Sequence, residues 1–371
     1  MSRHLLAINF RDPAHPEAGG AELHLEHVLL EAVRRGWRVT WLAAGFPGGA
    51  PESEHRGMRV IRRGDWWSFN LVVPGVLGRE FGRGRAPDLV VEDVNKVPCM
   101  APWHTRAPVA VVVPHLFGST AFREANPVVA SYVIGLEALI PWAYARCRFV
   151  AISESTRDDL IARGIEPSRI SVVHCGVDHE RYRRDPSVPK AAAPTLMFVG
   201  RLRRYKGLDW VLRSLPAVRA RVPGVRLEVV GDGPYAPALR AQVSSRKLDG
   251  AVEFLGHLSP ADKVRRLQAS WALIQPSPKE GWGLTTVEAS ACGTAVVASD
   301  APGLRDAVRR DETGLLVRFG DDTGLADALV RVLSDAALRE RLAEAGTRWA
   351  ARFRWDECAR RTLDALAGEA P

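Results

Sequence analysis

Two glutamates near the carboxyl end of the chain stand eight residues apart in the segment EGWGLTTVE, residues 280–288. This spacing puts Glu280 in a loop and Glu288 two turns up the helix that the loop opens, near one face. Gly281 and Gly283 leave backbone amides open at the start of that helix, where a phosphate or sugar oxygen can approach. The segment therefore indicates a site for a polyhydroxylated, phosphorylated ligand. The alternative is a surface loop followed by a solvated helical carboxylate.

A second candidate site is the loop GRLRRYKG, residues 200–207, which follows an apolar run at 195–199 and precedes a helical pattern. Arg201 and Lys206 stand five residues apart in this loop. Two cations in a strand-to-helix turn can bracket a diphosphate, which carries about two negative charges, and the helix dipole adds to their field. The loop therefore predicts a diphosphate site.

The next strand-to-helix turn contains the sequence GDGP, residues 231–234, which formally matches a dinucleotide-binding fingerprint. Glu253 follows at a distance that suits a ribose contact. However, the turn belongs to the second strand-helix unit of its domain, Pro234 stiffens it, and the cationic loop upstream already supplies a phosphate site. We therefore do not assign a dinucleotide to this turn.

Fewer residues in the first half of the chain suggest chemistry. Gly19 and Gly20 lie between the first expected strand and its helix, where paired glycines can form an amide-lined anion site. A flexible loop that opens a helix is the alternative. His115 ends the apolar run 111–115, at the edge where ligands bind. A lone histidine is usually structural, so only this position makes His115 a candidate.

Strand-like runs alternate with helical ones along the whole chain, which is typical of parallel sheets with crossover helices. The expected strands are 5–10, 39–43, 89–92, 109–113, 149–152, 170–173, 195–199, 227–230, 252–255, 272–275 and 295–298. A Pro/Ala-rich linker at 185–194 interrupts the series. The sequence thus predicts an α/β protein with two doubly wound, Rossmann-like domains. Ligands of such sheets bind outside the strand carboxyl ends, so we expect them in a cleft that the two domains face.

The composition fits this interpretation. A chain of 371 residues that is 46% hydrophobic and 25% charged suits two globular domains of about 150–200 residues each. Its five cysteines are odd in number and lack metal-ligand spacing, which indicates neither a disulfide framework nor a zinc site and favours a reducing cytoplasm. The apolar run at the amino terminus is too short for a signal peptide. The longest apolar stretch, 127–145, contains Glu137 and Pro141, so we expect a buried or interfacial helix and not a membrane span.

A net charge of +8 and a pI near 9.6 favour anionic partners. Nucleic acid is not expected among them, because the chain has no recognition module. Arg59, Arg62 and Arg63 precede the apolar segment WWSFNLVV, residues 66–73. Such a cluster suits docking at the inner face of an anionic membrane. A core helix with solvated arginines above it is equally compatible with this segment, which would then not dock on a membrane.

Taken together, these motifs resemble the family 4 retaining glycosyltransferases, which have the GT-B fold. The resemblance covers essentially the whole chain and is most specific in its second half. It rests on the residues GGAE at 19–22, GRL at 200–202 with KG at 206–207, GDGP at 231–234, FLGH at 254–257 and the 280–288 segment. It implies an acceptor-side domain at 1–185, a nucleotide-sugar-binding domain at 186–348, and a C-terminal helix within 349–371 that crosses back to the first domain.

The resemblance also implies a role for each motif in the second half. Arg201 and Lys206 would bind the donor diphosphate, and Glu288 the ribose hydroxyls. Glu280 would bind the donor sugar, together with the backbone amides of Gly281, Trp282, Gly283 and Leu284. The backbone near His257 and Leu258 would hold the base.

In the first half, His115 would lie beside the transferred sugar, and Gly19 and Gly20 would form a loop that closes over it. The segment VEDVNKVP, residues 91–98, departs from the family pattern. Because acceptors of this family bind in the first domain, the resemblance does not identify the acceptor. The chain contains no Asp-X-Asp triplet, consistent with cationic side chains rather than a metal neutralising the leaving group. We therefore expect no cofactor and no metal requirement.

The sequence thus predicts an enzyme that moves a sugar from a UDP- or GDP-sugar to an acceptor hydroxyl with retention at the anomeric carbon. Preorganised positive charge should dominate its catalysis, since the diphosphate leaves an oxocarbenium-like centre. The acceptor would be a saccharide, a lipid-linked molecule or a small molecule, in glycan, glycolipid or natural-product biosynthesis. Two alternatives remain: a nucleotide-sugar epimerase of the same architecture, and a non-catalytic nucleotide-binding protein.

Overall fold

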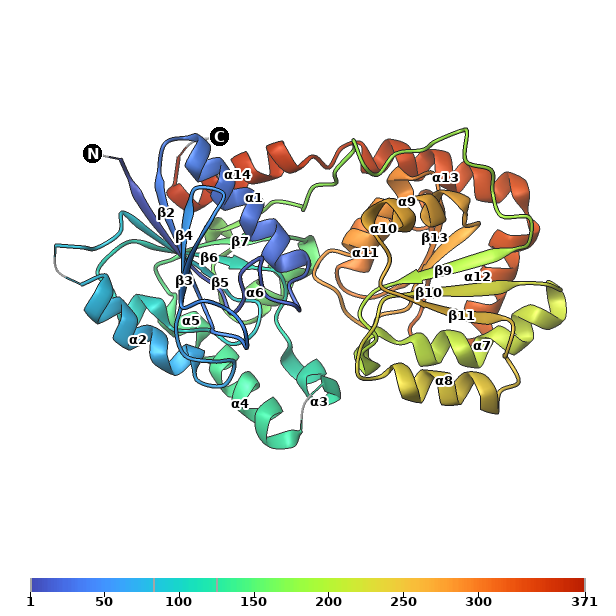
Figure 1. Cartoon of the computed structure of the whole chain (residues 1–371), viewed down its shortest axis with the longest axis horizontal. Helices are drawn as coiled ribbons and strands as arrows, with labels where there is room; N and C mark the ends of the chain where they lie inside the picture. Colours follow the sequence, from blue (N-terminus) through green and yellow to red (C-terminus); the bar gives the residue numbers. More distant parts are fainter. Residues whose placement is uncertain (1, 83, 125, 370–371) are drawn as a thin grey trace. The chain divides into compact units, whose positions relative to one another are not determined.

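The structure is a computed structural model that describes residues 2–82, 84–124 and 126–369. Its contacts divide the chain into two compact units (Figure 1). The first unit contains Met1–Gly176 and Trp355–Pro371, and the second unit is Val177–Arg354. Each unit has helices around a sheet of mostly parallel strands, which confirms the predicted α/β class with two doubly wound domains.

The unit boundaries differ from the predicted ones, which were 185/186 and 348/349. Tyr182 packs in the second unit, where the ammonium of Lys263 lies 4.8 Å from its ring centroid. Near the other boundary, the rings of Phe353 and Trp282 are 5.0 Å apart. Because of these contacts the second unit begins at Val177 and ends at Arg354.

The first unit contains an eight-stranded sheet of order β3-β4-β2-β1-β5-β6-β7-β8. All its pairs are parallel except β3 with β4. The strands are β1 (His4–Ile8), β2 (Arg38–Ala43), β3 (Glu52–His55), β4 (Met58–Arg62), β5 (Leu89–Asp93), β6 (Val109–Val113), β7 (Arg148–Ala151) and β8 (Ile170–Val172). Most are continuous apolar runs, as expected for parallel strands that are buried on both faces.

The hairpin of β3 and β4 was not predicted. Strand β3 reads Glu-Ser-Glu-His and lies at the edge of the sheet, so it lacks the apolar signature of a buried strand. The two strands are joined by Arg56 and Gly57, whose φ angles are 51° and 83°. Positive φ at both turn residues is the geometry of a two-residue hairpin loop.

Helices cover both sheet faces of the first unit. They are α1 (Gly20–Arg34), α2 (Phe69–Glu80), α3 (Ala121–Glu124), α4 (Pro127–Ala138), α5 (Ile140–Ala143), α6 (Glu154–Ala162) and α14 (Trp355–Ala367), with 3₁₀ turns η1 (Ala101–Trp103), η2 (Gly118–Thr120) and η3 (Pro167–Arg169). Helix α14 packs on α1, where the Trp355 ring stacks on His27 with centroids 4.3 Å apart. The C-terminal helix predicted within 349–371 begins at Trp355, and residues 349–350 instead end α13 of the second unit.

The second unit contains a six-stranded parallel sheet of order β11-β10-β9-β12-β13-β14. Its strands are β9 (Thr195–Val199), β10 (Arg226–Val230), β11 (Val252–Gly256), β12 (Ala272–Gln275), β13 (Ala295–Ser299) and β14 (Leu315–Val317), and its helices are η4 (Arg204–Lys206), α7 (Leu208–Arg221), α8 (Ala236–Ser245), α9 (Pro260–Ala269), α10 (Leu284–Ala291), α11 (Leu304–Ala307), α12 (Asp322–Ser334) and α13 (Ala336–Ala350). The chain builds outward from β9 to β11 and then returns to the other side of β9. The strand order therefore reverses between β9 and β12, and ligands of open α/β sheets bind at such a point.

The stability of the first unit should depend on pH through His24 of α1. Its side chain is buried, and neither ring nitrogen has a hydrogen-bond partner among the described residues. Burial, aided by the nearby His27, lowers the pKa of His24 from 6.5 to about 4. Between pH 6.5 and about pH 4, His24 is therefore protonated in the unfolded chain and neutral in the folded chain. The contribution of His24 should be complete above pH 6.5 and should fall by roughly 3 kcal/mol by pH 4.

Urea unfolding of His24→Gln at pH 7 and pH 4.5 measures this effect. The loss of stability between the two pH values should be smaller in His24→Gln than in the wild type. Exposed His104 supplies the control, and His104→Gln should keep the wild-type pH dependence. An unchanged pH dependence in His24→Gln would contradict this account.

Candidate functional site

The loops after β9 and β12 bring three of the predicted site residues together at the strand reversal of the second unit. Arg201 and Lys206 lie between β9 and α7, and Glu280 lies between β12 and α10. The Lys206 ammonium is 2.6 Å from Glu280 Oε1, and Gln275 Nε2 donates to the same oxygen at 3.2 Å. The two charged side chains are only 14% and 16% exposed. The edge of the sheet at which ligands are expected thus carries a partly buried ion pair.

The surroundings of Lys206 favour its charged form. Burial by itself lowers the pKa of an ammonium, and the positive charge of Arg201 acts in the same direction. Attraction to Glu280 and their hydrogen bond outweigh both, so the pKa of Lys206 is raised. Lys206 is therefore a fixed cation that can neutralise a bound anion.

Glycines hold these loops in close contact. Gly207 has a φ of 75°, and a Cβ atom there would lie 2.5 Å from the carbonyl oxygen of Pro276. Gly303 has a φ of 77°, and its Cβ would lie 2.2 Å from the carbonyl oxygen of Glu280. The Glu280 amide also donates to Pro302 at 3.1 Å. The backbone of Glu280 is thereby fixed from two sides.

The glycines of the 231–234 turn have a packing role. A Cβ atom on Gly231 would lie 2.1 Å from the Gly200 carbonyl oxygen, and one on Gly233 would lie 2.4 Å from that of Leu202. The Leu202 amide donates to the Asp232 carbonyl at 2.9 Å. These glycines allow the loops after β9 and β10 to touch. Close packing of the two loops therefore explains the GDGP sequence, and no bound dinucleotide is needed to explain it.

Helix α10 begins directly after the predicted sugar-binding segment. Gly283 is its N-cap residue with a φ of 77°, and Leu284 is its first residue. Trp282 is buried, in edge contact with Phe353. The first amides of a helix have no partner within it, so Gly281 to Leu284 lead into the amide-rich end that the sequence predicted.

Glu288 lies in the second turn of α10 with partners that the sequence did not indicate. Lys263 of α9 approaches its Oε2 at 3.0 Å. Burial, together with the charge of Glu288 and a hydrogen bond to it, raises the pKa of the Tyr182 phenol. Both partners lie far from Glu288 in sequence, so no local motif links them to it. The role of Glu288 at a ribose stays a prediction.

His257 and Leu258 follow β11 at the same carboxyl edge of the sheet. His257 is exposed and Leu258 is half-buried. The strand ends of β10 and β11 are tied together, since the Gly231 amide donates to the Gly256 carbonyl at 2.7 Å. The two residues therefore share a sheet edge with the cationic loop, and their contact with a base stays a prediction.

The remaining predicted residues belong to the first unit. Gly19 is the N-cap residue of α1, and its amide donates to Glu22 Oε2 at 2.7 Å. Gly20 begins the helix. His115 lies in the loop after β6, with its ring 5.1 Å from that of Phe117. Glu137 of α4 fixes this loop by accepting the amides of Phe117 and Gly118 at 2.6 and 2.9 Å.

A buried polar network, which the sequence did not assign to the site, lies where the first sheet reverses between β1 and β5. Asn9 Nδ2 donates to Asp93 Oδ2 at 3.0 Å, and Asn95 Nδ2 donates to Asn9 Oδ1 at 2.9 Å. Asn95 also reaches Glu22 Oε1 at 3.4 Å. Burial, and then the charge of Glu22, raises the pKa of Asp93 well above its usual value. The network connects the end of β5 to Glu22, which holds the Gly19 amide.

The signal for this network was present in the sequence. Asn9 directly follows the apolar part of the first strand, and Asp93 and Asn95 follow that of β5, inside the segment that departs from the family pattern. Only the sheet order makes the two strands neighbours.

Within residues 2–82, 84–124 and 126–369, no group of three or more His, Cys, Asp or Glu side chains could hold a metal ion. No helix in this part of the chain is long and apolar enough to cross a bilayer.

Known proteins resemble this chain in both sequence and fold. It is 34% identical over 292 residues to a D-inositol 3-phosphate glycosyltransferase from Nocardioides sp., which covers 72% of this chain and 61% of the relative. It is 30% identical over 210 residues to a GDP-mannose-dependent alpha-(1-6)-phosphatidylinositol monomannoside mannosyltransferase from Mycobacterium tuberculosis, covering 52% of this chain and 54% of the relative. The chain thus spans about three fifths or less of the length of these relatives.

Among solved structures, sucrose-phosphate synthase from Thermosynechococcus elongatus matches with a TM-score of 0.82 and 21% identity over 97% of both chains. Anabaena HepE in complex with UDP-glucose matches with a TM-score of 0.75 and 20% identity over 98% of this chain and 99% of the other. Residues 18–181 match Glycosyltransferase Family 4, and residues 181–349 match Glycosyl transferases group 1. Together these matches run from residue 18 to residue 349, and the chain belongs to the group 1, family 4 glycosyltransferases of GT-B fold.

Proposed function

We propose that this glycosyltransferase moves a sugar from a nucleoside diphosphate sugar to an acceptor hydroxyl, with retention at the anomeric carbon. The observation that supports this most directly is the Lys206–Glu280 pair, with Arg201 nearby, at the strand reversal of the second sheet. A donor carries both groups that such a pair can bind. The diphosphate is an anion for the cations, and the sugar hydroxyls are donors for the carboxylate.

In the proposed reaction, the bond between the anomeric carbon and the diphosphate oxygen breaks, and the electron pair stays on the diphosphate. The acceptor oxygen bonds to the anomeric carbon on the same face, and its proton passes to the leaving phosphate. Lys206 and Arg201 stabilise the charge that develops on the leaving group. Glu280 holds the sugar by accepting hydrogen bonds from its hydroxyls.

The donor is proposed to be a UDP- or GDP-sugar that binds without a metal. Two similarities support these bases: the HepE structure contains UDP-glucose, and the mannosyltransferase is named GDP-mannose-dependent. A thermal-shift panel of UDP, GDP and ADP and their sugars, with and without EDTA, tests the proposal. The correct donor should raise the melting temperature with EDTA present, since a ligand at 100 times its Kd adds about 2.7 kcal/mol of stability.

The panel also separates the alternatives. If none of the nucleotides changes the melting temperature, the donor proposal is wrong. Conversion of the bound donor in the absence of any acceptor would indicate an epimerase, which the names of the relatives do not favour. Binding without turnover over a range of acceptors would indicate a non-catalytic protein.

The two glutamates should be separable by kinetics. Glu288→Gln should mainly raise KM for the donor, because its proposed contact is to the ribose. Glu280→Gln should mainly lower kcat, because its proposed contact is to the transferred sugar. Steady-state transfer assays with varied donor measure both constants. Equal changes in kcat and KM for both variants would contradict the assignment.

The acceptor is proposed to be lipid-linked or close to a membrane. The first unit exposes large apolar side chains on α2, α4, α5 and the turn before α2: Trp67 is 73% exposed, Leu71 70%, Val128 79% and Trp142 75%. Asn70 of α2 donates to the hydroxyl of Tyr132 of α4 at 2.6 Å, so these helices are neighbours. The apolar stretch at 127–145 thus forms interfacial helices, which place Ile140, Ala143 and Tyr144 in the core and expose Val128 and Trp142.

The predicted basic cluster does not contribute to such a surface as expected. Arg62 is buried and bonds both oxygens of Asp12, at 2.7 and 2.8 Å. Arg59 pairs with Glu52 at 2.8 Å, and Arg63 pairs with Glu52 and Glu80. Burial removes Arg62 from the predicted cluster, carboxylates already pair with Arg59 and Arg63, and membrane contact stays a prediction.

Co-sedimentation with anionic vesicles tests membrane contact. Trp67→Ser/Leu71→Ser should reduce sedimentation, since burial of each apolar side chain in the interface contributes roughly 1–3 kcal/mol. Arg59→Ala/Arg63→Ala, the matched control, should sediment like the wild type. If the wild type does not sediment at low salt, the proposal of a lipid-linked acceptor is wrong and the acceptor is a soluble molecule.

A further inference from the structure

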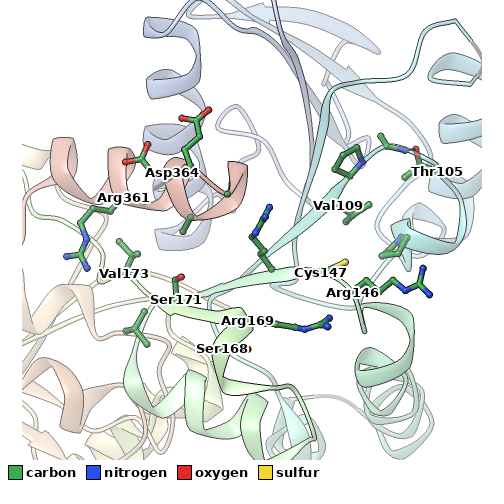
Figure 2. A pocket seen from close by; sticks show the side chains of 18 of the residues that line it. Thr105, Val109, Arg146, Cys147, Ser168, Arg169, Ser171, Val173, Arg361 and Asp364 are labelled. Carbon is green, nitrogen blue, oxygen red and sulfur yellow. Dashed lines mark hydrogen bonds between the residues drawn. The ribbon is translucent and has the colours of Figure 1, made fainter. Parts of the chain in front are cut away.

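A pocket of about 1080 Å³ lies in the first unit, at the edge of the sheet opposite to the carboxyl ends of the strands. Its walls come mostly from residues that precede or begin β6, β7 and β8, and from the face of α14 that carries Arg361 and Asp364 (Figure 2). The segments before and within the strands are 105–109, 146–148, 168–169 and 171–173. Gly19, Gly20 and His115 do not line it. The pocket is therefore distinct from the site described above.

The lining of this pocket is strongly basic. It contains five arginines: Arg106, Arg146, Arg148, Arg169 and Arg361. Figure 2 shows Arg146 and Arg169 extending in the same direction at one side, and Arg361 on α14 at the other. Asp364 and Glu369 also line the pocket, but arginines outside it pair with them. Asp364 pairs with Arg35 at 2.7 Å, and Glu369 pairs with Arg3 at 2.5 Å.

Most of these arginines lack a close counter-ion. Arg106, Arg146 and Arg148 form no ion pair with any residue in the described part of the chain. Arg361 has only a 3.8 Å contact with Glu357, and Arg169 only a 3.4 Å contact with Glu166. Positive charge therefore accumulates here without compensation from the protein.

The sheet register places two of these charges side by side. Phe149 of β7 pairs with Ile170 of β8, on strands about 4.8 Å apart, and Arg148 and Arg169 directly precede these two residues in sequence. Like charges at neighbouring positions repel one another. Arg169 Nη1 is buried with no hydrogen-bond partner among the described residues. An anion between the two guanidinium groups would remove the repulsion and satisfy this donor.

A glycine directly after helix α14 leaves room for the guanidinium group of Arg148. Gly368 has a φ of 69°, and a Cβ atom there would lie 2.3 Å from Arg148 Cζ. Any side chain at position 368 would displace the Arg148 guanidinium. The backbone at the end of α14 thus lies directly against this guanidinium.

We propose that this pocket binds a phosphate-bearing anion with two or more negative charges, held by Arg106, Arg146, Arg148 and Arg169. Guanidinium groups match phosphate oxygens with two parallel hydrogen bonds and keep their charge at all physiological pH values. The volume accommodates an organic phosphate or the headgroup of a lipid, and the phosphate is the chemistry that these ligands share. The site uses none of the residues of the donor proposal.

Tripolyphosphate is the soluble probe, and isothermal titration calorimetry measures its affinity. The titrations use an Arg201→Ala/Lys206→Ala background, so that the donor loop does not contribute. In this background, Arg146→Gln/Arg148→Gln should weaken binding roughly tenfold or more per lost guanidinium contact. Arg246→Gln/Arg341→Gln removes the same charge from exposed positions of the second unit and should leave the affinity unchanged. Because Arg148 contacts Gly368, Arg106→Gln/Arg146→Gln is the second variant, which keeps that contact.

The second experiment measures binding of the same variants to phosphatidylcholine vesicles with or without phosphatidic acid. Arginine-dependent tripolyphosphate binding supports the site and indicates a soluble phosphate, whereas arginine-dependent binding to phosphatidic acid alone supports it and indicates a lipid headgroup. Two outcomes would overturn the proposal: binding in neither experiment, and equal affinity in the pocket variants and in the donor-loop background that carries them.

Discussion

Lys206→Ala is expected to lower the rate of sugar transfer by roughly one to two orders of magnitude. A charge-assisted hydrogen bond contributes about 1.5–3 kcal/mol, and each 1.36 kcal/mol of barrier changes the rate tenfold. The loss should appear in kcat, because Lys206 neutralises charge that develops as the diphosphate leaves. Single-turnover transfer assays with saturating donor measure it. Arg201→Ala should have an effect of similar size.

Two controls make this result specific. Arg204 lies in the same turn with an exposed side chain, so Arg204→Ala removes a nearby charge without removing the proposed contact, and it should retain wild-type transfer. Lys206→Ala also leaves Glu280 without its 2.6 Å partner. Because Glu280 has its own proposed contact with the transferred sugar, Lys206→Ala/Glu280→Gln should be no more active than Lys206→Ala. Wild-type turnover in Lys206→Ala would refute the cation site.

Gly303→Ala should give the largest loss of stability among the single substitutions considered. Its φ of 77° disfavours any side chain, and the new Cβ would lie 2.2 Å from the Glu280 carbonyl oxygen. The backbone conformation costs roughly 1–2 kcal/mol, and the steric overlap adds roughly 1–3 kcal/mol. Transfer should also fall by up to about 100-fold, because a displacement of 1 Å at a reacting group can have that effect.

Gly250→Ala separates the two causes. Gly250 has the same φ of 77°, but a Cβ atom there meets nothing within 4 Å. It should therefore lose only the roughly 1–2 kcal/mol of the backbone term and keep full transfer activity. Urea denaturation and transfer assays of the two variants give the comparison. Equal losses in both would show that the contact with Glu280 has no importance.

Local apolar patterns predicted most of the sheets. Val109–Val113, Thr195–Val199 and Ala272–Gln275 have the predicted bounds, because a parallel strand that is buried on both faces is a continuous apolar run. Strands β3, β4 and β14 were not predicted. An edge strand such as β3 is stabilised by backbone pairing and leaves little trace in side-chain hydropathy.

The candidate site was predicted as a set of separate motifs, and its contacts were not. Arg201, Lys206 and Glu280 were each found after a strand, but their meeting depends on β9 lying beside β12, which are separated by β10 and β11 in sequence. Arg62 shows the opposite failure. Its charge suggested a lipid contact, whereas its partner Asp12 lies 50 residues earlier in the chain. Pairing across a sheet is set by strand order, which no local pattern encodes.

The return of α14 to the first unit sets an order of events during synthesis. The first unit needs α14 to cover α1, where Trp355 stacks on His27. The ribosome makes α14 only after the whole of Val177–Arg354, which is a continuous segment. Domains usually fold as units in the order in which they emerge. In this chain the second unit can complete its fold first, while the first unit, although synthesised earlier, must wait with one face of α1 uncovered.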